Sequence, residues 1–126
     1  MPISLLRYPG GKSRAVNKIL PLIPLGTSTL LSPFMGGGSV ELAWAKKHPQ
    51  GKVFACDFFK PVAIFWEMVK TDPTRMANVV RDYYPLEKEC FYTLQQTHST
   101  EKDPMEIAAQ FYVLNRCSFS GSTLSG

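Results

Sequence analysis

Cysteine and histidine are scarce in this chain, and their spacing argues against two kinds of site. The 126 residues include three cysteines, Cys56, Cys90 and Cys117, and none of them belongs to a Cys-x-x-Cys pair. An odd number of widely spaced cysteines is typical of reduced thiols, so we expect neither a disulfide framework nor a zinc site. The two histidines, His48 and His98, lie in polar surroundings without a partner pattern. We therefore expect a cytoplasmic protein without a metal centre.

Long apolar runs, internal repeats and low-complexity segments are also missing. No run approaches the roughly 18 apolar residues that a membrane span requires, and the N-terminus lacks a signal-peptide pattern. The composition is 44% hydrophobic, which suits one modest domain with a real core. The formal net charge of +4 favours a polyanionic partner such as nucleic acid only slightly.

The most informative stretch is a glycine-rich loop between a predicted strand and a predicted helix. Residues 29–31 form a short apolar run with a β-branched start, which is typical of a buried strand. Residues 39–47 show helical spacing of apolar side chains, and Ser39 is a candidate cap for the first turn. Between them, residues 32–38 read Ser-Pro-Phe-Met-Gly-Gly-Gly. Strand, glycine loop and helix in this order present backbone N–H groups to a ligand.

An acidic residue follows the next predicted strand. Residues 52–56 are that strand, and Asp57 comes 19 residues after Gly38, close to the roughly 20-residue spacing of a carboxylate that binds ribose hydroxyls. The glycines do not follow the dinucleotide fingerprint, and Glu41 in the first helical turn would repel a pyrophosphate. The pattern therefore favours a nucleoside without phosphates, such as S-adenosylmethionine. A plain turn and a helix-capping acid remain the structural alternative.

A second informative stretch, Tyr-Pro-Gly-Gly-Lys, occupies residues 8–12. Pro-Gly-Gly predicts a turn that places Tyr8 and Lys12 on opposite sides of a pocket-sized opening. The tyrosine ring can stack on a base or attract a sulfonium cation. A plain surface turn with an exposed lysine is the alternative. Residues 13–20 then read as a short helix that stops at Pro21.

The second half of the chain reads as helical throughout. Residues 61–70 carry an apolar stripe at helical spacing, with a proline in the first turn. Residues 71 to about 117 divide into three further helical segments, because Asp72-Pro73, Pro85 and Asp103-Pro104 are typical helix-start signals. Since no strand pattern occurs here, we expect a helical insertion.

A third informative stretch lies where the last predicted helix ends, near Arg116. Asn115 and Arg116 are residue types that bind adenine and guanine edges through two hydrogen bonds, and a Ser/Gly-rich loop follows them. An arginine that bonds the last carbonyls of a helix is the ordinary alternative.

Together these stretches resemble the Dam-type, D12-class DNA adenine-N6 methyltransferases, in the family's order and over nearly the whole chain. The resemblance rests on residues 8–12, residues 33–39, Asp57, residues 114–116 and residues 118–121. It implies an α/β fold, a partial Rossmann-like sheet of the S-adenosylmethionine-dependent methyltransferases with a helical insertion. Residues 1–70 would form the N-terminal part of the cofactor-binding domain, and residues 71–126 the helical target-recognition region and the start of the following loop.

The resemblance also implies a cofactor, a partner and site residues. S-adenosylmethionine would donate a methyl group to the amino group of adenine in double-stranded DNA, without a metal and without a membrane. The residues implied to bind the cofactor are Tyr8, Pro9, Gly11, Lys12, Pro33, Phe34, Gly36, Gly38 and Asp57. Those implied to approach DNA are Asn115, Arg116, Ser118 and Ser120.

One motif of the family does not occur in these 126 residues. It is the Asp-Pro-Pro-Tyr tetrapeptide, which accepts hydrogen bonds from the adenine amino group and stacks on the flipped base. Asp72-Pro73 and Asp103-Pro104 lack its second proline and its aromatic residue. We therefore expect the N-terminal part of a methyltransferase, truncated or completed by a separately encoded C-terminal half, that carries no catalytic residue and is inactive alone. A non-catalytic DNA- or cofactor-binding module and an NAD-type nucleotide-binding fragment are the alternatives.

Overall fold

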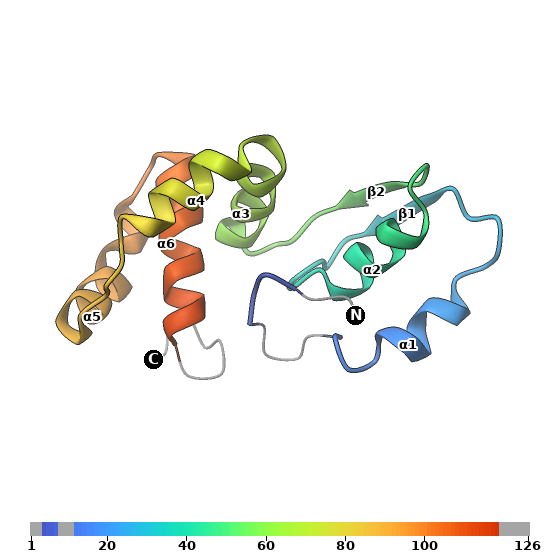
Figure 1. The fold of residues 1–126 in the computed structure, drawn as a ribbon, viewed down its shortest axis with the longest axis horizontal. Coiled ribbons are helices and arrows are strands. Elements are labelled where there is room, and N and C mark those ends of the chain that lie inside the picture. The colour runs from blue at the N-terminus through green and yellow to red at the C-terminus, as the bar shows by residue number, and fades with distance from the viewer. Residues whose placement is uncertain (1–3, 8–11, 119–126) are drawn as a thin grey trace. The chain divides into compact units, whose positions relative to one another are not determined.

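The structure, a computed structural model, describes residues 4–7 and 12–118, and the chain divides into two compact units. Met1–Phe58 contains the sheet, and in Phe59–Gly126 the regular elements among the described residues are helices (Figure 1). Mixed helices and a small parallel sheet place the chain in the α/β class.

The first unit is a strand–helix–strand arrangement preceded by short helical turns. Its elements are α1 (Val16–Ile19), the 3₁₀ helix η1 (Leu20–Leu22), β1 (Thr29–Ser32), α2 (Ser39–Lys47) and β2 (Lys52–Ala55). The two strands pair in parallel, with Leu31 opposite Phe54. The predicted strands and the predicted helix after the glycine loop are thereby confirmed, although β2 ends at Ala55 instead of Cys56.

The core of this unit forms around Trp44 of α2. Its side chain is 1% exposed, and Ala43, Val16 and Leu6 are buried as well. Gly51, just before β2, lies so close to the indole that an added Cβ would approach the ring to 2.5 Å. A glycine at this position therefore allows β2 to begin directly beside the tryptophan.

Two local predictions in the first unit were wrong. Ser39 does not cap α2: Gly38 is the N-cap, in the left-handed region at φ 71°, and the side chain of Ser39 is buried inside the first turn. The first helix begins at Val16 instead of residue 13, although it does end before Pro21, at Ile19. Pro21 lies at the start of η1, where its missing N–H group would have no helical partner anyway, so the chain continues as a 3₁₀ turn.

The second unit consists of four α-helices and one 3₁₀ turn in its described part. They are α3 (Lys60–Thr71), α4 (Pro73–Arg81), α5 (Lys88–Thr97), η2 (His98–Thr100) and α6 (Pro104–Cys117). The helical reading from residue 61 onward is confirmed, although α5 begins at Lys88 and not at Pro85. Asp72 and Asp103 cap α4 and α6, since their carboxylates accept hydrogen bonds from the N–H groups of Arg75 at 3.1 Å and Glu106 at 3.0 Å.

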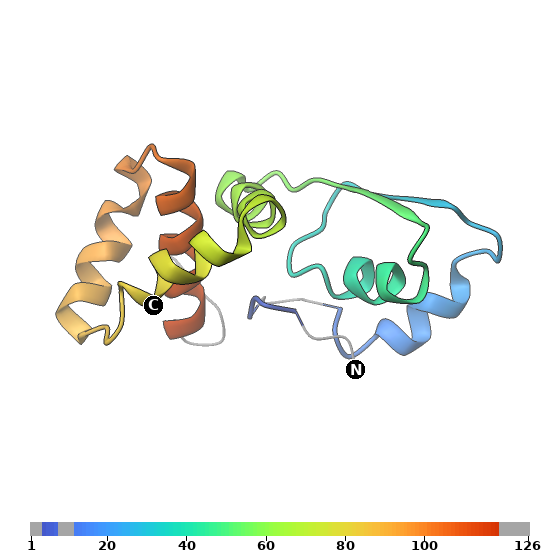
Figure 2. The same ribbon diagram turned by 45° about the horizontal axis from the view of Figure 1, so that its top comes forward.

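Helix α6 is the centre of this unit, packing against α3, α4 and α5 (Figure 2). Val113 and Leu114 on α6, like Phe65 on α3, have no exposed surface. The ring of Phe65 stacks on Tyr112 with centroids 5.7 Å apart. Because α3 packs on α6, the compact units divide at Phe59, whereas the functional division expected from the sequence lies after residue 70.

Candidate cofactor-binding site

The glycine loop between β1 and α2 has a backbone that glycine accommodates best. Gly36 and Gly38 have φ values of 52° and 71°, in the left-handed region that is unfavourable for residues with a Cβ. Both glycines and Gly37 between them are buried. The loop is therefore a packed structure whose conformation depends on its glycines.

The loop after β1 is hydrogen-bonded to the residues that follow β2. The N–H group of Gly36 donates to Oδ2 of Asp57 at 2.8 Å, and the N–H group of Met35 donates to the carbonyl of Cys56 at 3.0 Å. The glycine loop and the acid that the spacing singled out thus meet at the carboxyl ends of two parallel strands, where α/β proteins bind ligands. Asp57 is half-buried, and the N–H group of Gly36 holds its carboxylate in place.

Two phenylalanine side chains near this junction are exposed. Phe34, in the glycine loop, is 83% exposed, and Phe58, directly after Asp57, is 98% exposed. Flat apolar rings in these positions suit an aromatic ligand such as an adenine ring. Sequence reasoning selected Phe34 but missed Phe58, because a phenylalanine between a strand and a helix carries no pattern that separates an exposed ring from a buried one.

The N-terminal segment is tied to the same loop. The hydroxyl of Ser4 donates to the carbonyl of Gly37 and accepts a hydrogen bond from the N–H group of Leu6 at 3.1 Å. Sequence reasoning did not find Ser4, since a contact over 33 positions leaves no local signal. Lys12 is exposed, and Tyr8, Pro9 and Gly11 lie outside the described residues.

Glu41 lies in the first turn of α2, and its Oε2 accepts a hydrogen bond from the hydroxyl of Ser32 at the end of β1. The carboxylate is half-buried. A carboxylate at a helix start opposes binding of a pyrophosphate.

The residues present fit a nucleoside cofactor. A half-buried carboxylate can accept hydrogen bonds from ribose hydroxyls, exposed rings can contact the base, and Pro33 and Phe34 form an exposed edge of the loop. Among the described residues, no group of three or more His, Cys, Asp or Glu side chains could hold a metal ion. In the same part of the chain, every helix is too short or too polar to cross a membrane.

The residues expected to approach DNA lie at the end of α6, in the second unit. Asn115 is fully buried and Ser118 is 3% exposed. The Ser118 hydroxyl donates to the carbonyl of Asn115 at 3.0 Å, so this serine closes the helix end. Arg116 is exposed, and Ser120 lies outside the described residues.

Tyr84 contacts the same helix end. Its hydroxyl lies 3.7 Å from Sγ of Cys117. The pKa of Tyr84 is raised to about 12, first by burial and then by the hydrogen bond with Cys117 and the charges of Cys117 and Tyr112. The charge of Arg116 lowers it. The tyrosine therefore stays neutral at physiological pH.

Residues 8–126 match the family described as D12 class N6 adenine-specific DNA methyltransferase. The type II methyltransferase M.MjaIII of Methanocaldococcus jannaschii is 25% identical over 132 residues, which cover 92% of this chain and 46% of that protein. A DNA adenine methylase of Salmonella typhi is 26% identical over 121 residues, covering 94% of this chain and 42% of the relative. The chain thus spans less than half the length of these relatives. It belongs to the D12 class of N6 adenine-specific DNA methyltransferases.

Proposed function

We propose that this chain is the cofactor-binding part of an enzyme that methylates the amino group of adenine in double-stranded DNA in the cytoplasm. The observation that carries the proposal is the hydrogen bond from Gly36 to Asp57, which joins the glycine loop to the acid at the ends of two parallel strands. Family membership supports the reaction. The two strands with α2 between them would then belong to a Rossmann-like sheet.

S-adenosylmethionine would supply the methyl group from its sulfonium. Asp57, oriented by Gly36, would accept hydrogen bonds from the ribose. Phe34 would cover the cofactor, and the backbone of Gly36 to Gly38 would approach it closely. The other residues proposed to line this site are Tyr8, Pro9, Gly11, Lys12 and Pro33.

Calorimetry on the 126-residue chain tests this assignment. S-adenosylhomocysteine should bind in preference to NAD, and Asp57→Ala should weaken binding by about 1.5–3 kcal/mol, the range for hydrogen bonds to a charged group. Asp57→Asn keeps an acceptor for the N–H group of Gly36, so it should weaken cofactor binding less than Asp57→Ala does. Asp82→Ala, which removes an exposed acid of the second unit, is the control. Equal affinity of the Asp57→Ala variant, or a preference for NAD, would remove the ribose assignment.

DNA contact is proposed for the end of α6 and the loop after it, Asn115, Arg116, Ser118 and Ser120. Of the described members, Arg116 presents its side chain at the surface, while Asn115 and Ser118 shape the helix end from inside. In this arrangement the arginine makes the direct contact.

Titration of the whole protein with matched and single-mismatch duplexes at two salt concentrations tests this contact. If Arg116 binds a base, Arg116→Ala should weaken the free energy of DNA binding by about 1–3 kcal/mol. It should also relax the base preference at one position of the recognised site. If it binds phosphate, affinity should fall about equally on all sequences and the salt dependence should flatten. Arg81→Ala, in the last turn of α4, is the matched control. Unchanged affinity of Arg116→Ala on every duplex would exclude the DNA role.

The missing Asp-Pro-Pro-Tyr motif favours a second candidate function, a non-catalytic module that binds S-adenosylmethionine or DNA. The two candidates differ in one measurement. The whole protein should transfer methyl groups to adenine under the first proposal and bind without transfer under the second.

A further inference from the structure

The helical unit contains a pocket that neither the family motifs nor the proposed function use. It has a volume of about 590 Å³ and lies between the first turn of α3 and the segment that runs from η2 into α6. Its wall is apolar on the α3 and α6 sides, where Phe59, Ile64 and Phe111 line it. The volume falls within the range of roughly 300–1,000 Å³ that is typical of small-molecule sites.

The apolar wall offers an aromatic surface. Phe59 and Phe111 meet edge to face, with ring centroids 6.1 Å apart and planes inclined by 65°. Phe59 remains 37% exposed, whereas Phe111 is buried. One ring is thus held firmly by the core and supports a second that a flat ligand can reach.

The rim of the pocket carries two lysines, Lys60 and Lys102. Both are exposed, and within the described residues neither of them forms an ion pair. The rim also contains an acid, Glu101. Its Oε1 accepts hydrogen bonds from the N–H groups of Lys102 and Asp103, each at 3.1 Å. Its Oε2 accepts a hydrogen bond from Nε2 of Gln110 on α6 at 3.3 Å.

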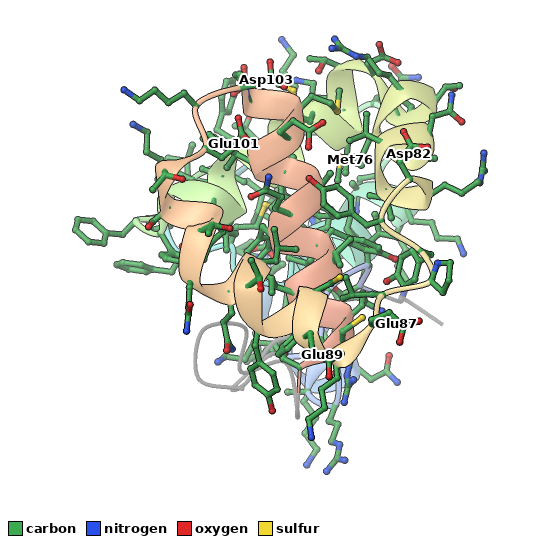
Figure 3. All side chains as sticks on the ribbon, turned by 90° about the vertical axis from the view of Figure 1, so that its left-hand side faces the viewer. Met76, Asp82, Glu87, Glu89, Glu101 and Asp103 are labelled. Atoms are coloured by element: carbon green, nitrogen blue, oxygen red, sulfur yellow. The ribbon has the colours of Figure 1, made fainter. Side chains whose placement is uncertain are left out.

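Asp103 is similarly occupied. Its carboxylate caps α6 through the N–H group of Glu106, and Figure 3 labels Glu101 and Asp103 near the first turn of that helix. Both nearby acids keep their negative charge, but their hydrogen bonds are to N–H groups of the protein and not to the ammonium group of either lysine. With Glu101 in the lining, the two ammonium groups still leave a net positive charge at the rim for an anion.

We propose that this pocket binds a nucleotide, with the base against Phe59 and the phosphate between Lys60 and Lys102. An aromatic wall beside two lysines that form no ion pair with the part of the chain that the structure describes matches a flat ring that carries an anionic group. The bound nucleotide is either a free nucleotide or one nucleotide of a DNA strand, and the two share this chemistry. With a free nucleotide the proposal goes beyond the proposed function, because the methyl donor has no phosphate and its residues lie in the other unit. With a nucleotide of a DNA strand it rests on the proposed function.

Calorimetry on the 126-residue chain tests the pocket with deoxyadenosine 5′-monophosphate, deoxyadenosine and inorganic phosphate. The monophosphate should bind saturably. Deoxyadenosine should bind at least about tenfold more weakly, since one charge-assisted contact is worth at least that factor, and inorganic phosphate, which lacks the base, should also bind more weakly. The double change Lys60→Gln and Lys102→Gln should weaken monophosphate binding by a similar factor. The same double change at Lys70 and Lys88, exposed lysines outside the pocket, should leave it unaltered.

A variant of the wall separates the base contact from the charge. Phe59→Leu keeps apolar volume without the flat ring. It should therefore weaken binding of the monophosphate and leave binding of inorganic phosphate unchanged. Circular dichroism of each variant confirms that the helices remain folded. If a short single-stranded oligonucleotide displaces the monophosphate, the ligand is part of a DNA strand. If it does not, the ligand is a free nucleotide.

Several outcomes would overturn the pocket assignment. They are the absence of saturable monophosphate binding, equal binding of phosphate or deoxyadenosine alone, and full affinity of the Lys60 and Lys102 variant. Self-association of the chain that Phe59→Leu abolishes would assign the wall to a second copy instead. Displacement of the monophosphate by S-adenosylhomocysteine would place it in the cofactor site. A failed Asp57→Ala test, by contrast, would remove the cofactor assignment and leave this one intact.

Discussion

At the scale of single residues, the orientation of Asp57 depends on a peptide group in another loop. Gly36 donates its N–H to Oδ2 of this carboxylate, and its φ of 52° belongs to the left-handed region. The spacing of glycine and acid predicted that the two would share a site. The hydrogen bond between them could not be predicted, because it depends on how the buried loop turns after Pro33.

Replacement of Gly36 by alanine should therefore affect stability and cofactor binding together. A Cβ at this left-handed position should lower the free energy of unfolding by about 1–2 kcal/mol and turn the N–H group away from Asp57. Gly26→Ala is the matched control, since its φ of 85° imposes similar strain while no atom lies within 4 Å of the added Cβ. Urea unfolding should show a loss for Gly36→Ala, which is buried, at least as large as for the exposed Gly26→Ala. Calorimetry should show weaker S-adenosylhomocysteine binding for Gly36→Ala alone. Equal binding by both would show that the loop conformation does not orient the acid.

At the scale of elements, helix boundaries followed from local chemistry, while the contacts between helices did not. Asp72-Pro73 and Asp103-Pro104 predicted the starts of α4 and α6, because an aspartate cap and a proline in the first turn act within a few residues. Tyr83 lies just after α4, which ends at Arg81. Its hydroxyl donates to Oε2 of Glu106 on α6 at 2.6 Å, a contact over 23 positions that no local pattern indicates.

The contact between Tyr83 and Glu106 should make stability depend on alkaline pH. Burial first, and then the hydrogen bond to Glu106, raises the pKa of Tyr83 from 10.0 to about 12. Because the unfolded chain releases this proton at lower pH than the folded chain, the stabilisation is complete below pH 10 and decreases as the pH rises toward 12. Tyr83→Phe should lower the free energy of unfolding by about 1–3 kcal/mol at neutral pH.

Urea unfolding between pH 8 and roughly 11 measures this dependence as the difference between the wild type and Tyr83→Phe. The difference should shrink above pH 10, the ordinary pKa of tyrosine. Tyr92→Phe, which changes an exposed tyrosine of α5, provides the reference for general alkaline effects. A difference that stays constant over this range would show that Tyr83 does not titrate differently in the folded chain.

At the scale of the whole molecule, the sheet has one face without cover in the described structure. Leu31 and Phe54, opposite each other on β1 and β2, are 73% and 59% exposed. Parallel sheets are normally buried on both faces, so this face fits the proposal that the two strands belong to a larger methyltransferase sheet. The sequence predicted both strands from their apolar runs. It could not show which face α2 leaves uncovered, because both faces of a buried parallel strand are apolar.

The last prediction concerns catalysis by the chain alone. Methyl transfer needs an acceptor for the adenine amino group and an aromatic ring for the flipped base, and these 126 residues lack the motif that provides them in the family. Incubation of the chain with radiolabelled S-adenosylmethionine and mixed-sequence DNA should therefore give no incorporation above background. A DNA adenine methylase that carries the motif is the positive control, and the Asp57→Ala variant of this chain is the negative one. Incorporation into adenine by the chain alone, abolished by Asp57→Ala, would place the catalytic groups within these residues and refute the prediction.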